Sequence, residues 1–336
     1  MGLRAIVTGT GMYVPERIVT NDDLAQRMDT SDEWIQKRTG IRERHHVVAG
    51  ETPVDLALAA SERALAAAGL EPADLDAIIL ATLSPHADFP GTSFFLHERL
   101  GVAEIPCFDL RAQCSGFVYS LAVANSFIRS EMFKRVLVVG CEVHSTGLDF
   151  STEGRDVAVL FGDGAGAVVV ESRDGPDDGP GILEIRLHAE GKHARKLWLE
   201  APGSGLWPHR IDREVIEAGL HFPKMDGRVV FKHAVTRMPQ VLLDTLGAAS
   251  LKLEDIHLFL FHQANLRINE YVANQLEIPP EKCLNNIQQY GNCSAASIPM
   301  LLDEAVRSDR LLPGQLVSMT SFGSGFSWTS AVVRWG

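Results

Sequence analysis

Three residues spread along the chain have side chains suited to acyl-transfer chemistry, and the first of them is Cys114. It stands where the extended run Cys107–Leu110 gives way to residues 115–124, whose composition is typical of a buried helix. The positive end of a helix dipole stabilises a thiolate at the helix N-terminus. We therefore expect Cys114 to be a nucleophile with a lowered pKa, although a small buried core cysteine would show the same local pattern.

His262 and Asn292 are the other two candidates. His262 directly follows the apolar run Leu258–Phe261, which places it at the carboxyl end of a strand, where α/β folds build their sites. Asn292 lies in a turn of small residues at 290–297, before a predicted helix at 299–306. An imidazole exchanges protons near neutral pH and an amide can donate to a developing oxyanion, but a core histidine and a turn asparagine are equally ordinary.

Two glycine-rich turns, residues 161–167 (FGDGAGA) and 322–326 (FGSGF), complete the set of chemically suggestive segments. Neither has the Lys-Ser/Thr pair of a phosphate-binding loop, and the first precedes a strand and not a helix. Each is therefore either a tight turn or a place where backbone N–H groups face an oxyanion.

The elements that would position these residues alternate between strand-like and helix-like patterns. Apolar, β-branched runs at 77–81, 136–140, 165–170, 258–261, 316–319 and 331–333 alternate with helical patterns such as 55–68 and 234–246. This alternation indicates an α/β fold.

Features of the first half recur in order in the second half. Residues 74–80 resemble 255–261, residues 113–116 (QCSG) resemble 292–295 (NCSA), and residues 161–164 resemble 322–325. We predict two duplicated halves: residues 1–175, which carry Cys114, and residues 176–336, which carry His262 and Asn292. The Gly/Pro/Asp-rich stretch 172–181 suits the junction. Residues 191–227 break the pattern and are predicted to be a long surface loop, of the kind that is often functional.

Composition narrows the function classes. The chain has 336 residues, 46% of them apolar, and a formal net charge of −12, which disfavours nonspecific nucleic-acid binding. We expect no membrane span, since no run of about 18 apolar residues occurs. A cytoplasmic location is expected because the N-terminus shows no signal-peptide pattern. Five cysteines without a CxxC pair argue against both a disulfide framework and a zinc site.

Several of these segments together resemble the β-ketoacyl-acyl carrier protein synthase III family of the thiolase superfamily. The resemblance runs nearly end to end and is strongest at 30–35 (TSDEWI), 38–44 (RTGIRER), 114–117 (CSGF), 161–167, 262–268 (HQANLRI), 291–297 (GNCSAAS) and 322–328 (FGSGFSW). It implies a thiolase-like fold, in which two pseudo-duplicated α/β halves form a five-layer αβαβα sandwich.

The resemblance also implies a mechanism. Cys114 would take an acyl group from acyl-coenzyme A as a thioester. Malonyl-acyl carrier protein would then lose carbon dioxide, and His262, protonated on Nε2, would hold the enolate oxygen together with Asn292. The enolate would attack the thioester, with the oxyanion held by the backbone N–H groups of Cys114 and Ser324. The reaction would serve the initiation of fatty acid or related biosynthesis.

Substrate contacts are implied position by position. The coenzyme A contacts would be Trp34, Arg38, Arg155, Gly227, Phe231, Ala264 and Asn265, the acyl-pocket residues Phe89 and Phe322, and the carrier-protein contacts Lys232, Gln263 and Arg267. Phe89 matches a position that reaches into the partner subunit in dimeric relatives, which implies a homodimer and a short primer such as acetyl. The resemblance implies no cofactor or metal beyond the two thioester substrates.

Some residues depart from the family pattern. Ser324 replaces the middle glycine of a Gly-Gly-Gly turn, Arg228 stands where an asparagine commonly contacts coenzyme A, and the 191–227 segment is long. Alternatives therefore stay open: an enzyme of secondary metabolism on the same fold that condenses long chains or acylates another acceptor, a noncatalytic acyl-coenzyme A binding protein, and, with less support, a thiolase proper or a zinc hydrolase.

Overall fold

Two five-stranded sheets form the framework of the computed structural model, which describes residues 2–176 and 179–336. The first sheet has the order β1 (Gly2–Tyr13), β7 (Gly164–Gly175), β6 (Arg135–Glu142), β4 (Ala77–Ala81) and β5 (Cys107–Leu110). The second has the order β8 (Gly181–Ala189), β14 (Ser327–Arg334), β13 (Leu316–Gly323), β11 (Leu258–Phe261) and β12 (Cys283–Leu284).

The two sheets match strand for strand. In each, the first two pairings are antiparallel and the last two are parallel. The strands of the first sheet all precede residue 176 and those of the second all follow it. Asp177 and Asp178, within the predicted junction, lie outside the described residues.

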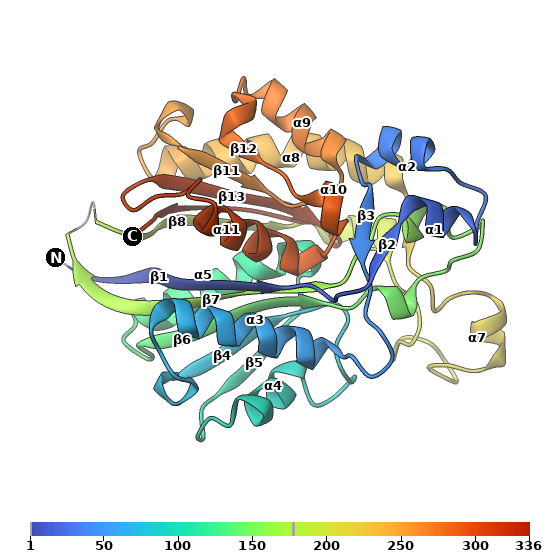
Figure 1. Cartoon of the computed structure of the whole chain (residues 1–336), viewed down its shortest axis with the longest axis horizontal. Coiled ribbons are helices and arrows are strands. Elements are labelled where there is room, and N and C mark those ends of the chain that lie inside the picture. Colours follow the sequence, from blue (N-terminus) through green and yellow to red (C-terminus); the bar gives the residue numbers. More distant parts are fainter. Residues whose placement is uncertain (1, 177–178) are drawn as a thin grey trace.

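Helices separate and cover the sheets, as Figure 1 shows. Helices α3 (Pro53–Ala68) and α4 (Thr92–Leu100) lie on the outer face of the first sheet. Helices α5 (Gly116–Arg129) and α11 (Ser297–Arg307) lie between the sheets, and α8 (Gly227–Ala248) and α9 (Leu266–Gln275) cover the second sheet. These layers confirm the predicted five-layer, thiolase-like α/β sandwich.

Local sequence explains where the main helices begin. Thr52 accepts from the backbone N–H of Asp55, whose carboxylate accepts in return, so α3 begins with a reciprocal cap and Pro53 in its first turn. Gly69 ends it in the left-handed conformation. Helix α8 begins earlier than the predicted residue 234, because Asp226 caps the backbone N–H of Val229.

The shorter elements surround one end of the sandwich. They are β2 (Ile18–Thr20), α1 (Asn21–Ala25), α2 (Asp32–Thr39), β3 (Glu43–His45), α6 (Arg155–Ala158), β9 (Leu197–Trp198), α7 (Arg213–Glu217), β10 (Lys224–Met225) and α10 (Ile287–Tyr290). The 191–227 segment, predicted to be a long surface loop, therefore contains secondary structure, since β9 and β10 pair within it.

The internal repeat is real but one predicted alignment was wrong. The 3-10 turn η2 (Gln113–Ser115) leads into α5, as η7 (Ser294–Ala296) leads into α11. Both turns begin with a non-glycine residue at positive φ, 46° at Gln113 and 45° at Ser294. The equivalent of Cys114 is therefore Ala295 and not Cys293, because the onset of the helix, and not the shared Cys-Ser pair, sets the register.

The largest cluster of core residues lies between the sheets, where α5 and α11 contribute residues such as Leu121 and Leu301 that are fully buried. Strands covered on both faces are apolar without alternation, which is why β4 and β11 could be predicted to the residue. Among the described residues no helix is long and apolar enough to cross a membrane.

The middle layer should dominate stability. Leu301→Ala in α11 removes a side chain that is 0% exposed, so we expect it to lower the free energy of unfolding by about 2–5 kcal/mol. Leu243→Ala on α8, where the side chain is 46% exposed, should change it by roughly 0.5 kcal/mol or less. Urea denaturation measures both; equal losses would mean that the central layer is not the principal core.

Candidate active site

The structure brings Cys114, His262 and Asn292 to the wall of one cavity of about 820 Å³. Cys114 comes from η2 at the start of α5, His262 follows β11, and Asn292 follows α10. All three residues are buried. The site is therefore built from both halves of the molecule, at the end of the layers where the two central helices begin.

Close backbone packing holds Cys114 in place. A Cβ at Gly323, the last residue of β13, would lie 2.9 Å from Cys114 Cβ and 3.1 Å from its backbone nitrogen. Atoms cannot approach so closely, so the position requires glycine. Gly323 thereby lets the 322–326 turn lie directly against the nucleophile.

Burial dominates the electrostatics of Cys114. It raises the pKa of the thiol to about 11, even though the Ser294 hydroxyl, 3.5 Å from Sγ, and the backbone N–H groups of Cys114 and Ser324 act in the opposite direction. The nearby Glu142 carboxylate raises it further. The expectation of a lowered pKa was wrong, since loss of solvent around the anion outweighs the favourable dipole, and the resting group is a thiol.

His262 is a neutral imidazole with one free nitrogen. Burial lowers its pKa to about 3, and the nearby His144 adds to this effect. Its Nδ1 lies 2.6 Å from the Ser297 hydroxyl, which donates to the Ser294 carbonyl oxygen at 2.9 Å. This network assigns the resting proton to Nδ1, so Nε2, which has no hydrogen-bond partner among the described residues, is an acceptor. The predicted donor role requires the other tautomer.

Asn292 is fixed by its own backbone. Its N–H donates to Leu160 O at 2.8 Å and its carbonyl accepts from Gly162 N at 3.2 Å. Its Oδ1 accepts from Ser294 N at 2.8 Å, which leaves the Nδ2 amide as the end available to a ligand. The 161–167 turn therefore acts as a structural clamp on Asn292, and a Cβ at Gly162 would lie 2.1 Å from Tyr290 O.

The backbone N–H groups of Ser324 and Cys114 both act to lower the pKa of the Cys114 thiol, so the Ser324 N–H lies near the sulfur, while its role as an oxyanion contact stays a prediction. The Ser324 hydroxyl donates to Leu197 O of β9. The serine that departs from the glycine pattern thus ties the turn to the 191–227 segment, an interaction a glycine could not make.

The same cavity opens past predicted substrate contacts. Its walls include Trp34, Arg38, Gly227, Arg228, Phe231, Ala264, Asn265, Arg267 and Phe322. The guanidinium carbons of Arg38 and Arg155 lie 4.3 and 5.0 Å from the Trp34 ring centroid, and of the two only Arg38 lines the cavity. Asn265 caps α9 and donates to Arg38 O at 3.0 Å.

The predicted contacts Gln263, Phe89 and Lys232 do not line this cavity. Gln263 is 0% exposed and bonds to Phe261 O and Asn285 Oδ1, so it cannot touch a carrier protein, and that prediction was wrong. Phe89 is 81% exposed and lines neither cavity of this chain. Phe322 lines the cavity shared with His262 and not the second cavity described next. Lys232 lies exposed on α8, beside Phe231.

A second cavity of about 820 Å³ also reaches Cys114, and neither His262 nor Asn292 lines it. Its lining includes Leu83, Val143, His144, Leu148, Leu197 and Trp198. Sequence reasoning missed these residues, along with Ser294 and Ser297, because they come from separate segments that only the fold brings together. The 191–227 segment supplies one wall, and its length was the single sequence signal for it.

Comparison with known proteins agrees with this geometry. Residues 108–191 match the family described as 3-oxoacyl-[acyl-carrier-protein] synthase III, and residues 246–335 match its C-terminal family. A β-ketoacyl-[acyl-carrier-protein] synthase III of Bradyrhizobium sp. (strain BTAi1) is 44% identical, covering 100% of each chain.

Solved structures agree as well. The crystal structure of the 3-oxoacyl-[acyl-carrier-protein] synthase III of Aquifex aeolicus VF5 has a TM-score of 0.88 and 42% identity, covering 98% of this chain and 100% of that one. The priming β-ketosynthase of the R1128 polyketide pathway has a TM-score of 0.89 and 32% identity, covering 100% of this chain and 98% of that one.

The raised pKa of Cys114 predicts how its alkylation depends on pH. The thiolate fraction should rise from neutral pH to beyond about pH 9, so the rate of iodoacetamide modification at Cys114, followed by peptide mass spectrometry, should rise without a plateau. Ser294→Ala removes a hydrogen bond that favours the thiolate and should slow modification at fixed pH, whereas the exposed Ser308→Ala should not. A plateau below about pH 7 would contradict the buried-thiol interpretation.

Proposed function

This chain belongs to the 3-oxoacyl-[acyl-carrier-protein] synthase III family and is an acyltransferase of the condensing type, and we propose that it performs its reaction in two steps on Cys114. The observation that carries the proposal is the convergence of Cys114, His262 and Asn292 on one cavity, with two backbone N–H groups at the sulfur. Each step needs only the side chains of this chain and two thioester substrates.

In the first step the thiol must lose its proton. Because Cys114 is a thiol at rest and His262 Nε2 is an acceptor in the same cavity, the imidazole takes the proton as the sulfur attacks an acyl-coenzyme A. The backbone N–H groups of Cys114 and Ser324 stabilise the oxyanion. The acyl thioester then forms on Cys114, and coenzyme A leaves with the proton.

In the second step malonyl-acyl carrier protein loses carbon dioxide, and its thioester becomes an enolate. Asn292 Nδ2 and His262 Nε2–H donate to the enolate oxygen. That second donation needs the tautomer with its proton on Nε2, in which the Ser297 hydroxyl donates to Nδ1 instead of to Ser294 O. Reaching it requires the hydroxyl to rotate, the Nδ1 proton to leave and Nε2 to gain a proton. The enolate carbon attacks the acyl thioester, a β-ketoacyl-carrier protein is released, and the departing Cys114 thiolate takes up a proton from solvent.

Charge at the cavity mouth supports phosphorylated and acidic substrates. Arg38, Arg228 and Arg267 line the mouth against one carboxylate, Asp156, and Lys232 is exposed on the adjoining helix. They make this region locally positive, although the whole chain has a net charge of −12. They support binding of the phosphates of coenzyme A and docking of an acidic acyl carrier protein.

The second cavity supports binding of the acyl chain, since its lining is largely apolar and it reaches Cys114 without being lined by His262 or Asn292. The identity of the acyl donor and the pathway remain part of the proposal. Similarity to a priming ketosynthase of polyketide biosynthesis favours, as the second candidate, a priming role in secondary metabolism with the same chemistry.

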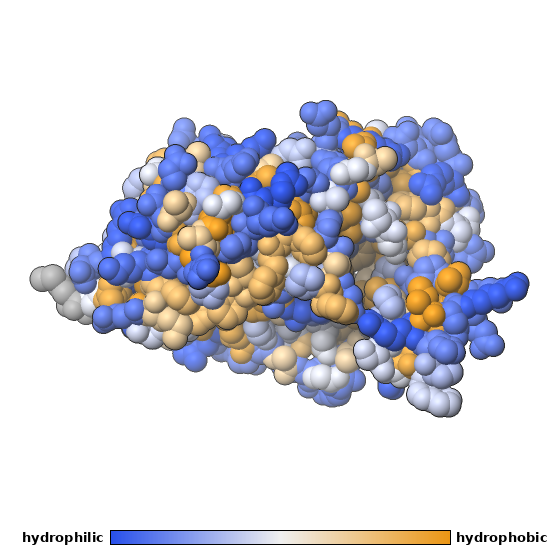
Figure 2. Space-filling model, turned by 90° about the horizontal axis from the view of Figure 1, so that it is seen from below, coloured by the Kyte–Doolittle hydropathy of each residue, from blue (hydrophilic) through white to orange (hydrophobic). Residues whose placement is uncertain are grey.

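We also propose a homodimer formed through β5. This strand is the edge of the first sheet and pairs only with β4, so its outer N–H and C=O groups can pair with another strand. Phe108 on β5 and Phe94 on α4 are 38% and 54% exposed. Figure 2 shows a broad apolar area on the face seen from below, the side on which β5 and α4 lie in Figure 1. A second copy related by a two-fold axis fits such a surface.

The catalytic proposal is tested by intact-protein mass spectrometry with acyl-coenzyme A donors of increasing length, followed by malonyl-acyl carrier protein. We expect an acyl adduct on Cys114, then a β-ketoacyl product and carbon dioxide. Cys114→Ser should abolish the adduct, and Asn292→Ala should keep it while lowering condensation by roughly 100-fold. Acylation without decarboxylation would show an acyltransferase to another acceptor, and no acylation with any donor would refute the role of Cys114.

Carrier docking forms a further arm of the same experiment. Lys232→Glu should raise the KM for malonyl-acyl carrier protein and leave acylation by acyl-coenzyme A unchanged, because Lys232 is exposed on α8 and does not line the cavity proposed to take coenzyme A. Lys134→Glu, equally exposed at the start of β6, is the matched control. An unchanged KM in both variants would remove Lys232 from the docking surface.

The dimer is tested by analytical ultracentrifugation. We expect the unmodified chain and Leu312→Glu, which alters an exposed apolar residue away from β5, to sediment as dimers, and Phe108→Glu to sediment as a monomer, because a carboxylate there has to be desolvated. A monomeric unmodified chain, or a dimer insensitive to Phe108→Glu, would disprove this interface.

A further inference from the structure

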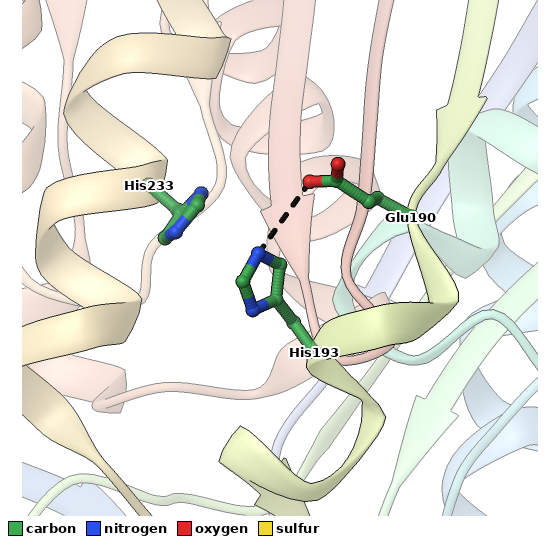
Figure 3. A group of neighbouring side chains, drawn as sticks. All are labelled: Glu190, His193 and His233. Atoms are coloured by element: carbon green, nitrogen blue, oxygen red, sulfur yellow. Dashed lines mark ion pairs between the residues drawn. The ribbon is translucent and has the colours of Figure 1, made fainter.

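We propose that Glu190, His193 and His233 form a binding site for a divalent transition-metal ion of the zinc class. Glu190 follows β8, His193 lies in the 3-10 segment η4 (Gly191–Lys196), and His233 lies on α8. Figure 3 shows the three side chains turned toward a common space between α8 and the chain after β8. None of the three lines either cavity that reaches Cys114.

The ligand atoms are close to the spacing that a metal needs. One potential ligand atom from each residue lies within 4.8 Å of the other two. Glu190 Oε2 and His193 Nε2 are 3.5 Å apart, close to the edge of about 3.4 Å expected for tetrahedral zinc with bonds of about 2.1 Å. A change of side-chain rotamer at His233, on α8, would bring its ring nitrogen from within 4.8 Å to the shorter spacing that zinc requires.

Two of these atoms make no hydrogen bond to another described group. Glu190 Oε2 and His193 Nε2 are both buried and make no hydrogen bond within the described residues. Buried polar atoms are costly unless they are satisfied. A metal ion satisfies both at once, whereas the present contact of 3.5 Å is too long to be a good hydrogen bond.

Neighbouring cations set the limits of the site. Lys192 Nζ pairs with the other carboxylate oxygen, Glu190 Oε1, at 2.6 Å and leaves Oε2 available. Arg237 Nη2 lies 3.7 Å from Oε2 and works against a second positive charge, although its guanidinium also stacks on Trp328. The site should therefore bind its metal less tightly than an all-anionic one.

The donor set points to the class of metal. Two imidazoles and one carboxylate suit zinc, which takes such ligands in a tetrahedron and leaves the fourth position for water. No zinc site was expected from the sequence, because its five cysteines form no CxxC pair. These ligands instead come from separate segments and meet only in the folded chain.

A metal ion here would stabilise the 322–326 turn through Phe326, which all three ligand residues contact. Glu190 exchanges two backbone hydrogen bonds with Phe326, at 2.7 and 3.0 Å, and the rings of His193 and His233 lie 5.0 and 5.3 Å from the Phe326 ring. Phe326 belongs to the 322–326 turn whose Ser324 N–H faces Cys114. The ion would link α8, η4 and this turn without touching substrate.

The test is zinc binding measured by equilibrium dialysis of the full chain against zinc chloride, together with thermal unfolding with and without zinc. Cys114→Ser is included, because a thiol also binds zinc. We expect one zinc equivalent in the unmodified chain and in Cys114→Ser, with affinity lowered more than about tenfold in His193→Gln and His233→Gln. Zinc should raise the unfolding midpoint only where it binds.

Two further variants separate a metal site from an ordinary ion pair. His209→Gln, which alters an exposed histidine in the 191–227 segment, should bind zinc as the unmodified chain does. Lys192→Gln should bind zinc at least as tightly, because it removes a competing cation from Glu190. If all histidine variants bind zinc equally, or no variant binds it above the blank, the cluster is only an ion pair stacked on Phe326 and the proposal fails.

Discussion

The close approach of the 322–326 turn to Cys114 is the constraint on which the rest of the site depends. Because Gly323 has no side chain, β13 of the second half can lie against the start of α5 in the first half. The same contact brings the Ser324 N–H to the sulfur and excludes water from it. One packing contact therefore builds the oxyanion site and also raises the pKa of the nucleophile.

The price of that burial is a nucleophile that is protonated at rest, and the neighbouring residues are arranged to match it. Burial also keeps His262 neutral, so the pair at rest is a thiol and a neutral imidazole and not a thiolate and an imidazolium. Ser294 contacts both sides of the pair: its hydroxyl donates to Cys114 Sγ, and its carbonyl accepts from the Ser297 hydroxyl, which also contacts His262 Nδ1. Reactivity thus depends on proton position within a dry site more than on a preformed thiolate.

The 191–227 segment connects several features that the chain keeps far apart in sequence. Leu197 lines both cavities, and its carbonyl oxygen accepts from the Ser324 hydroxyl. Glu190, just before the segment, and His193, near its start, lie against Phe326. The segment can therefore influence the acyl-binding space and the oxyanion turn together. The segment forms part of the wall of both cavities.

The sequence by itself determined the alternation of strands and helices, the two duplicated halves and the three residues that line the shared cavity, and the resemblance to a family supplied the layered architecture. Continuous apolar runs specify strands buried on both faces, and motifs such as HQANLRI carry their residue types directly. Only the tertiary structure decided that Gln263 is buried, that Cys114 corresponds to Ala295, and that Cys114 carries a raised pKa. Burial and charge depend on what other segments place around a group, and no local pattern in one segment encodes those neighbours.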